Sequence, residues 1–354
     1  MKGMLNRMLL LVLVVSCAAN DTAPSAPGAR TYRMGFTHFP PRLTIAEVIQ
    51  TMDSVSRHED AALMLVDVPW AALLADTSAS FLVRREYLDI AKVYKQRAIP
   101  VAATVDVTNG LDRAAEAPAL VKLGRSISEP AVQRVYREFA VAFDSIVHPT
   151  WLALAMETNL IRVLAPPKVY SALVAMINAT AQQARAAGST TTLMVSVQVE
   201  TAWGRLPSSS YVGIQRDRTD FPFVQAIGLS SYPYLGGFAT PEQIPIEYYL
   251  RLVADAPLPM LVVEGGWSSG SVTGATSSPA LQARYIRRQA QLADAAKLVG
   301  VFQITFTDFD LASYPAPPGS ILPLFAQLGL VDVNYRAKPA LAVWDSVRAT
   351  PLVP

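Results

Sequence analysis

The sequence is poor in the residues that build disulfides and metal sites. Its 354 residues include one cysteine, Cys17, and three histidines, His38, His58 and His148. A single cysteine forms no disulfide within the chain, so stability has to come from packing. The histidines are scattered without the spacing of metal ligands, and we expect neither a metal ion nor another cofactor.

The chain also lacks a strong charge of one sign. Thirty Lys and Arg residues against 28 Asp and Glu residues leave a net charge of +2, with no basic block, which gives no support for a nucleic-acid partner. No glycine-rich phosphate fingerprint follows an apolar run, which counts against a dinucleotide fold. No nucleophile elbow stands in the right context for a Ser-His-Asp hydrolase. Hydrophobic residues make up 51% of the chain, enough for a large core.

The N-terminus has the pattern of an export signal. Lys2 and Arg7 form a positive region, and residues 8–15 form an apolar run that is too short to span a membrane. An ordinary signal peptide with an incidental cysteine is one interpretation of this segment.

The residues Val14-Val15-Ser16-Cys17 resemble the lipobox of bacterial lipoproteins. The resemblance implies a signal peptide over 1–16, a lipid on Cys17, and attachment of the exported protein to the cell envelope. Residues 17–30, rich in Ala, Ser, Pro and Gly, would be a flexible tether before a folded domain at 31–350.

From residue 32 onward, short apolar runs alternate with helical patterns. The expected strands lie at 32–36, 62–66, 100–105, 151–155, 192–199, 226–229, 260–263 and 300–305. The expected helices lie at 81–97, 130–147, 167–187 and 279–298, with others beginning at Thr44, Thr240 and Pro339, and a polar loop fills 204–221. Eight β-then-α units predict a single-domain (β/α)₈ barrel of the α/β class. A doubly wound sheet and a two-lobed solute-binding protein are the alternatives.

Two glutamates stand where these strands end. Glu157 follows the fourth strand, and Glu264 follows the seventh, just before two glycines and Trp267. Residues at the ends of opposite barrel strands face each other across the mouth. Hydrolysis of a glycosidic bond needs two carboxyl groups, one to protonate the leaving oxygen and one to attack the sugar or activate water. The pair therefore predicts a glycosidase, for which we expect a monomer acting on carbohydrate.

Aromatic and polar residues gather at the same strand ends and are candidates for binding the substrate. Sugar rings stack on aromatic faces, although packing in the core or at the rim is an equally good explanation for any single residue. The candidates are His38, Trp70, Asn159, Trp203, Tyr232, Tyr234 and Trp267. Phe309 is a further possibility. For Asp67, Asp106 and Glu200, which also end strands, pairing with arginines is favoured over contact with substrate.

The motifs around these residues resemble those of clan A glycoside hydrolases, which are retaining (β/α)₈ enzymes. The residues Trp151-Leu-Ala-Leu-Ala-Met-Glu157-Thr-Asn159 resemble the strand-four motif, and Leu261-Val-Val-Glu264-Gly-Gly-Trp267 resembles the nucleophile strand. Ser230-Ser-Tyr232-Pro resembles the form seen in endo-β-1,4-galactanases, and the motif style as a whole is similar to endo-β-1,4-galactanase-like or cellulase-like families. The resemblance implies cleavage of β-linked poly- or oligosaccharide with retention, with Glu157 as acid/base, Glu264 as nucleophile and Tyr232 positioning Glu264.

One position departs from the clan. The residue before the acid/base is usually an asparagine that contacts the sugar 2-hydroxyl, and here it is Met156. Methionine cannot donate that hydrogen bond, which strengthens in the transition state. A carbohydrate-binding lipoprotein on the same barrel, with weakened or lost catalysis, is therefore the alternative function.

Overall fold

The computed structural model describes residues 28–207, 210–314 and 316–353. The expected signal peptide and Cys17 lie outside these residues, as does most of the expected tether. Within the described part, no helix is both long and apolar enough to cross a membrane.

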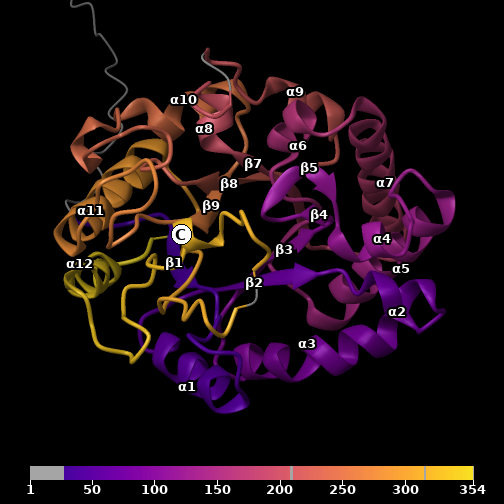
Figure 1. Cartoon of the computed structure of the whole chain (residues 1–354), viewed down its shortest axis with the longest axis horizontal. Helices are drawn as coiled ribbons and strands as arrows, with labels where there is room; N and C mark the ends of the chain where they lie inside the picture. The colour runs from indigo at the N-terminus through magenta and orange to yellow at the C-terminus, as the bar shows by residue number, and fades with distance from the viewer. Residues whose placement is uncertain (1–27, 208–209, 315, 354) are drawn as a thin grey trace, which may run out of the picture.

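The described residues form a parallel sheet of eight strands that curls into a barrel (Figure 1). The strands are β1 (Arg33–Phe36), β2 (Ala62–Asp67), β3 (Val101–Asp106), β6 (Trp151–Ala153), β7 (Thr192–Gln198), β8 (Ala226–Ser231), β9 (Met260–Gly265) and β10 (Gly300–Gln303). Their order in the sheet is β1-β10-β9-β8-β7-β6-β3-β2, which is the order along the chain closed into a ring. This confirms the (β/α)₈ barrel and excludes both the doubly wound sheet and the two-lobed alternative.

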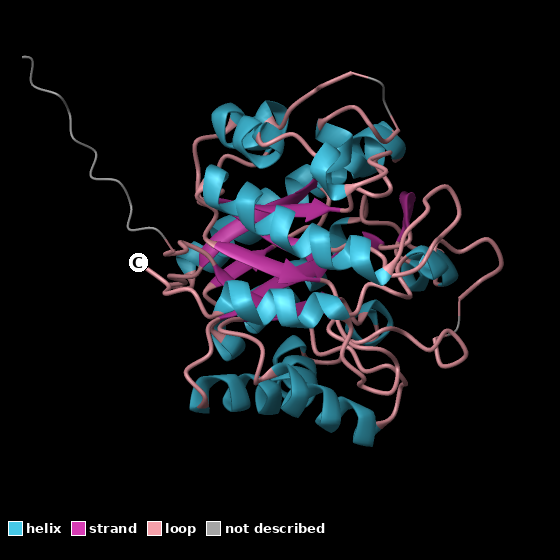
Figure 2. Cartoon of the chain, turned by 90° about the vertical axis from the view of Figure 1, so that its left-hand side faces the viewer, coloured by secondary structure: helices cyan, strands magenta, loops and turns pink. Residues whose placement is uncertain are grey.

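At least one helix follows every strand and covers the outside of the barrel (Figures 1 and 2). The longer ones are α1 (Ile45–Val55), α3 (Ala79–Gln96), α5 (Pro130–Val147), α7 (Pro167–Ala186), α10 (Glu247–Asp255), α11 (Pro279–Ala296) and α12 (Pro339–Arg348). Proline occupies the first turn of α5, α7, α11 and α12, where its missing N–H costs nothing. Thr44 caps α1 by accepting from the backbone N–H of Glu47, as the sequence predicts.

Three regions differ from the expected elements. A hairpin of β4 (Thr108–Asn109) and β5 (Asp112–Glu116) follows β3. The expected polar loop after β7 contains α8 (Val199–Ala202) and α9 (Gln215–Asp220). The helix expected from Thr240 is only a 3₁₀ turn, η1 (Pro241–Gln243), because Pro245 lacks the N–H that a continuing helix needs, and α10 begins two residues later.

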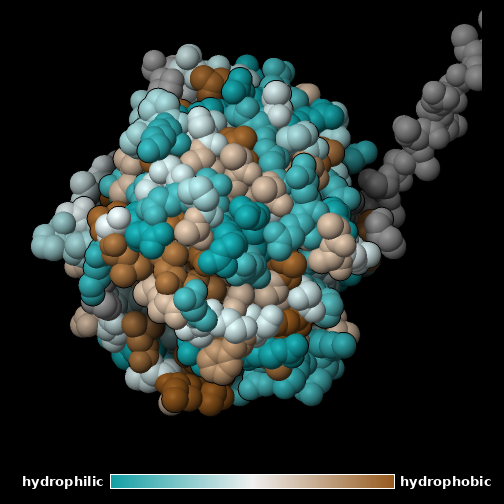
Figure 3. Space-filling view, turned by 90° about the vertical axis from the view of Figure 1, so that its right-hand side faces the viewer, coloured by the Kyte–Doolittle hydropathy of each residue, from teal (hydrophilic) through white to brown (hydrophobic). Residues whose placement is uncertain are grey.

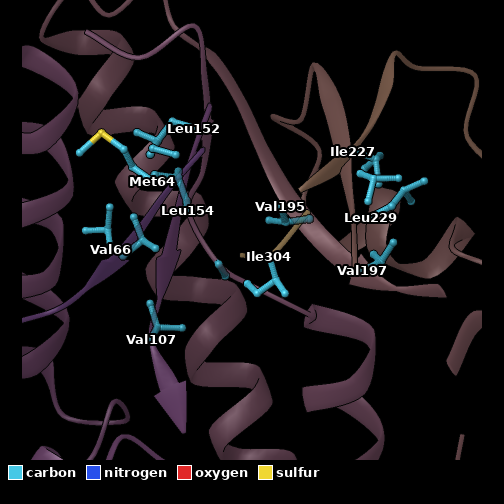
Figure 4. Packing of buried hydrophobic residues seen from close by; sticks show 14 of the residues in the cluster. Met64, Val66, Val107, Leu152, Leu154, Val195, Val197, Ile227, Leu229 and Ile304 are labelled. Carbon is cyan, nitrogen blue, oxygen red and sulfur yellow. The ribbon is translucent and has the colours of Figure 1, made fainter. Parts of the chain in front are cut away.

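Alternate residues of each strand pack on opposite sides of the barrel wall. The interior is filled by small and large side chains in combination, namely Ala61, Leu63, Ala102, Ala153, Met194, Ala226, Leu261, Val263 and Phe302. The outward residues pack under the helices, and Figure 4 shows Met64, Val66, Leu152, Val195, Val197, Ile227 and Leu229 among them. The barrel is thus a packed core, and any site must lie at its ends.

The outer surface is mixed in character. Figure 3 shows the side that carries α5, α7 and two short helices, α2 (Trp70–Leu74) and α4 (Pro118–Lys122), where hydrophilic residues are interspersed with apolar ones. Figure 2 shows the long loops gathered at one end of the barrel and the C-terminus at the other. The loop-bearing end is where the strands finish, and it holds the candidate site.

The barrel closes between β1 and β2 through backbone hydrogen bonds and the side chain of Asp60. No regular ladder joins these strands, but the Met34 carbonyl accepts from the N–H groups of Asp60 (2.8 Å) and Ala61 (3.2 Å). The Asp60 carboxylate in turn accepts from the Met34 N–H and from Arg30. Gly35 permits this approach, since a Cβ there would lie 1.8 Å from the Ala61 carbonyl oxygen.

We therefore expect Asp60→Ala to lower the free energy of unfolding by about 2–3 kcal/mol, because a buried guanidinium and a backbone N–H lose a charged acceptor. Asp89→Ala is the matched control. Asp89 pairs with Lys92 on the exposed face of α3, and its removal should cost less than about 1 kcal/mol. Urea unfolding measures both, and equal losses would contradict this role for Asp60.

Candidate active site

A backbone irregularity turns Glu264 into the barrel mouth. Leu261 and Val263 both face the barrel interior, so strict alternation would turn Glu264 outward. The register between β8 and β9 shifts at this point, with Leu229 opposite Val262 but Ser230 opposite Glu264. The extra residue is a β-bulge, and bulges commonly re-aim a side chain beside a functional site.

A second irregularity places Glu157. The regular part of β6 ends at Ala153, and Glu157 has φ of 48°, in the left-handed region that non-glycine residues seldom adopt. Its N–H donates to the Ser196 hydroxyl on β7 at 2.9 Å, which helps to fix this conformation. Such strain costs about 1–3 kcal/mol. Five other non-glycine residues of the described part also adopt a positive φ, among them His148 and Lys297 at helix C-termini.

A cavity of about 380 Å³ opens at this end of the barrel. Tyr232 and Glu264 line it, as does Met156. Its other lining residues are Phe39, Leu65, Val66, Asp67, Asp106, Gly110, Leu111, Arg113, Ile304, Phe309, Tyr314, Leu322 and Phe325. The lining is largely apolar, and several of its aromatic residues come from the segment after β10. Another cavity, of about 470 Å³, lies at the opposite end between α5 and α7 and contains none of the candidate residues.

Glu264 is held on one side only. The Tyr232 hydroxyl donates to its Oε1 at 2.8 Å, while Oε2 is buried and has no hydrogen-bond partner among the described residues. Burial raises the pKa of Glu264 to about 8; the nearby Glu157 carboxylate adds to the rise, and Arg113 and the Tyr232 hydrogen bond oppose it. Glu264 therefore has one buried oxygen whose hydrogen-bonding capacity the described residues leave unused.

Glu157 is held on both sides. Its Oε2 accepts from Arg113 Nε at 2.8 Å, and its Oε1 accepts from the Ser230 hydroxyl at 2.6 Å. Arg113 also donates to Asp106 at 2.6 Å and to the Thr108 hydroxyl at 3.0 Å. Burial alone would lower the pKa of Arg113, but the surrounding carboxylates of Asp106, Glu157 and Glu264 more than offset this and raise it.

The sequence did not single out Arg113. It lies on β5, in a segment whose polar, irregular pattern gives no sign of a hairpin. The prediction that the strand-end acids pair with arginines is confirmed for Asp106, which pairs with Arg113. It does not suit Glu200, which is fully buried and accepts hydrogen bonds from the Tyr248 hydroxyl at 2.7 Å and the Tyr232 N–H at 3.0 Å. Glu200 thereby supports the residue that contacts Glu264, and burial raises its pKa to about 7.

Most of the expected aromatic contacts lie away from the cavity. Trp70 is buried and stacks on Tyr136, and Trp203 stacks on Tyr248 and donates to its carbonyl. Trp267 is 1% exposed and packs between Tyr234 and Tyr285. Tyr234 is itself buried and donates to the Leu324 carbonyl. These side chains point into the layers between strands, helices and loops, because following a strand does not fix the direction in which a residue points.

The two remaining candidates have structural contacts. Asn159 is fully buried and ties the loop after β6 to β7, donating to the Gln198 carbonyl and accepting from its N–H, both at 2.8 Å. His38 shares a hydrogen bond with the Tyr94 hydroxyl, and burial lowers its pKa to about 4. Neither lines the cavity. Among the residues that the structure describes, no cluster of three or more His, Cys, Asp or Glu residues could hold a metal ion.

No protein-family model matches the chain, and no curated protein matches its sequence. Solved structures do match it. An exo-β-1,4-mannosidase from Opitutaceae bacterium strain TAV5 aligns over 90% of this chain and 59% of its own, with 15% identity and a TM-score of 0.62. A β-glucuronidase from an uncultured Clostridium species aligns over 90% and 50%, with 12% identity and a TM-score of 0.58. The β-glucuronidase of Dictyoglomus thermophilum aligns over 92% and 51%, with 12% identity and a TM-score of 0.58.

These structural neighbours are glycoside hydrolases, and at such low identity the likeness shows the fold that they share with this chain. The chain spans about half to three fifths of the length of these neighbours. What it does with the shared barrel has to be argued from its own site.

The raised pKa of Glu264 predicts how stability depends on pH. The folded state keeps the proton up to about pH 8, whereas an unfolded glutamate loses it near its ordinary value of 4.5. The stabilisation is therefore complete below about pH 4.5 and is lost as the pH rises to 8. We expect the unfolding free energy of the wild type minus that of Glu264→Gln to fall over this range, because only the wild type has this titrating group. A difference that stays constant or grows, measured by urea unfolding at several pH values, would contradict the assignment.

Proposed function

We propose that this protein is a retaining β-glycosidase in which Glu264 is the nucleophile and Glu157 the acid/base. The observation that carries the proposal is the state of Glu264. One of its oxygens accepts a hydrogen bond from Tyr232, the other is buried without a partner among the described residues, and the side chain lines the cavity. A nucleophile needs this combination of a fixed orientation and an unoccupied lone pair.

The arrangement of the second carboxylate supports the same chemistry. Glu157 and Glu264 interact electrostatically, and both are near Arg113, so they lie at one site although 107 residues separate them in the sequence. A pair of carboxyl groups about one sugar ring is what glycosidic bond cleavage requires. The glycosidase fold of the structural neighbours agrees with this proposal.

The motif and the structural neighbours point to different sugars. The strand-six motif points to β-galactan, while the structural neighbours act, by their names, on β-mannosides and β-glucuronides. We therefore test the protein on a panel of β-linked galactan, mannan, glucan and xylan, together with oligosaccharides and aryl β-glycosides, including glucuronides.

Replacing the nucleophile tests the proposal directly. We expect Glu264→Gln to lose about 10³-fold or more in kcat on the substrate that the wild type cleaves, because no covalent intermediate can form. Glu138→Gln, an exposed exchange of the same kind on α5, should keep full activity. Release of reducing ends or of the aryl group measures the rates. An active Glu264→Gln enzyme would overturn the assignment.

A carbohydrate-binding protein without catalysis is the second candidate. Met156 lines the cavity where the clan has a hydrogen-bonding asparagine, and Arg113 occupies the proposed acid/base. If the wild type and Glu264→Gln both bind a glycan by calorimetry and neither cleaves any member of the panel, this function replaces the first.

For the N-terminal segment we propose export and lipid attachment at Cys17. We expect Cys17→Ser to move the protein from the membrane fraction to the soluble fraction of the cell envelope, because the acyl chains would be lost. Ser25→Ala, in the same segment, should stay with the membrane. Fractionation with an antibody to the protein measures both. A wild type that is already in the soluble fraction would argue for an ordinary signal peptide.

A further inference from the structure

Asp67 is a carboxylate at the cavity that the proposed chemistry does not use. The sequence favoured an arginine partner for it, as for the other strand-end acids, and the structure gives it none among the described residues. Its neighbour Asp106 pairs with Arg113 at 2.6 Å. Asp67 itself is exposed and lines the cavity, and no ion pair or side-chain hydrogen bond with a described residue reaches its carboxylate.

The direction of the Asp67 side chain follows from the regularity of its strand. On β2, Met64 and Val66 pack under the helices, while Leu63 packs toward the barrel interior. Residues four apart on a strand share a face, so Asp67 points inward as Leu63 does. The pairing of β2 with β3 is unbroken and sets Asp67 directly opposite Asp106. The two carboxylates therefore stand side by side on the inner wall of the mouth.

The side chains of the lining that carry donors are engaged with other acceptors. With their acceptors, they are Arg113 with Asp106, Glu157 and Thr108, Tyr232 with Glu264, and Tyr314 with the Pro40 carbonyl. The remaining lining residues are acids, glycine or apolar. A ligand that covers Asp67 displaces its water, and an unpaired carboxylate is costly to desolvate. Such a ligand has to bring hydrogen-bond donors of its own.

Sugar hydroxyls are donors of the kind that Asp67 needs. Neighbouring carbons of a pyranose ring each carry a hydroxyl, and two of them can donate to the two oxygens of one carboxylate. Hydrogen bonds to a charged acceptor are stronger than neutral ones. The buried Oε2 of Glu264 is a second oxygen at this cavity without a partner among the described residues. The apolar remainder of the wall suits the C–H faces of a sugar ring.

We propose that Asp67 is a substrate-binding residue, whose carboxylate accepts hydrogen bonds from hydroxyl groups on neighbouring carbons of the bound sugar. The residue selects sugars that present those hydroxyls and discriminates against sugars that lack them. The proposal rests on the proposed carbohydrate site and names a determinant of its specificity. It applies whether the bound sugar is cleaved or only held.

Asp67 destabilises the folded protein when it is charged. Burial, and then the nearby Asp106 carboxylate, raise the pKa of Asp67, so the folded protein disfavours its charged form. We therefore expect Asp67→Ala to keep or raise the free energy of unfolding at pH 7, in contrast to Asp60→Ala. Urea unfolding measures this, and a loss like that of Asp60→Ala would assign Asp67 to the fold instead of the ligand.

Binding measured without turnover tests the contact. Glu264→Gln serves as the parent protein, and calorimetry on the panel of β-linked oligosaccharides and aryl β-glycosides identifies the sugar that it binds. We expect the added exchange Asp67→Ala to weaken that binding about 10- to 100-fold, which is the effect of a hydrogen bond to a charged group. Asp67→Asn, which keeps one acceptor oxygen, should fall between the two. Asp89→Ala, which removes an exposed acid of α3, should bind as the parent does.

Deoxy sugars separate a direct contact from an indirect one. The monodeoxy forms of the bound sugar are compared in the parent and in Asp67→Ala. Removing a hydroxyl that contacts Asp67 should lower affinity for the parent about tenfold or more and cost little in Asp67→Ala, because the contact is already gone. Removing any other hydroxyl should cost the same in both proteins. If every deoxy form loses equally in the two, Asp67 contacts no hydroxyl and the proposal is wrong.

An amino sugar is the competing ligand for this carboxylate. The aminodeoxy forms of the same sugar therefore complete the series. If one of them binds the parent more tightly than the hydroxyl form, and if that preference disappears in Asp67→Ala and weakens at high salt, the partner is an ammonium group. The hydroxyl proposal is then overturned.

The outcomes separate this proposal from the function on which it rests. If a glycan is bound or cleaved and Asp67→Ala behaves as its parent does, the carbohydrate site stands and Asp67 is not part of it. If no member of the panel is bound or cleaved, both proposals fail. Asp67→Asn has nearly the size of the original residue, so it answers the same question if Asp67→Ala folds poorly.

Discussion

Four carboxylates at one barrel mouth share a single cation among the described residues around them. Asp67, Asp106 and Glu264 line the cavity with Arg113, and Glu157 contacts that arginine from the segment that follows β6. Burying several like charges together is too costly unless they are paired or take up protons. Arg113 pairs with two of the acids, while burial and then the nearby Glu157 carboxylate raise the pKa of Glu264 against the opposing effect of Arg113.

The backbone at this mouth departs from regular geometry at the two candidate glutamates. The bulge on β9 breaks the alternation that would face Glu264 outward, and the left-handed conformation of Glu157 bends the chain between β6 and α6 (Thr158–Leu164). Buried polar contacts stabilise both departures. Ser196 holds the Glu157 backbone, and Glu200 holds the backbone of Tyr232. A regular barrel would bury apolar side chains at these positions, so the irregularities are what distinguish a site from a core.

The sequence predicted the barrel well, because eight repeats of a buried strand and a helix leave few other arrangements. It also identified Glu157, Glu264 and Tyr232, whose positions at strand ends follow from the same pattern. It failed where direction matters. Trp70 and Trp267 follow strands as Tyr232 does, yet they point into the packed layers. Arg113 was missed because the hairpin that carries it joins the mouth only through the fold, at a distance of 44 residues from Glu157.

Motifs of this kind therefore specify where two carboxylates stand, and a third residue specifies what they can do. The residues around Glu157 and Glu264 resemble those of glycosidases, but the surroundings of each carboxylate also depend on the nearest charged side chain. Here that charge belongs to a loop outside the motif. In an apolar cavity the pairing of Arg113 with Glu157 is stronger than it would be in water. A hairpin of a few residues can thus bring an arginine to two carboxylates that the motifs place at the mouth, although no motif predicts that contact.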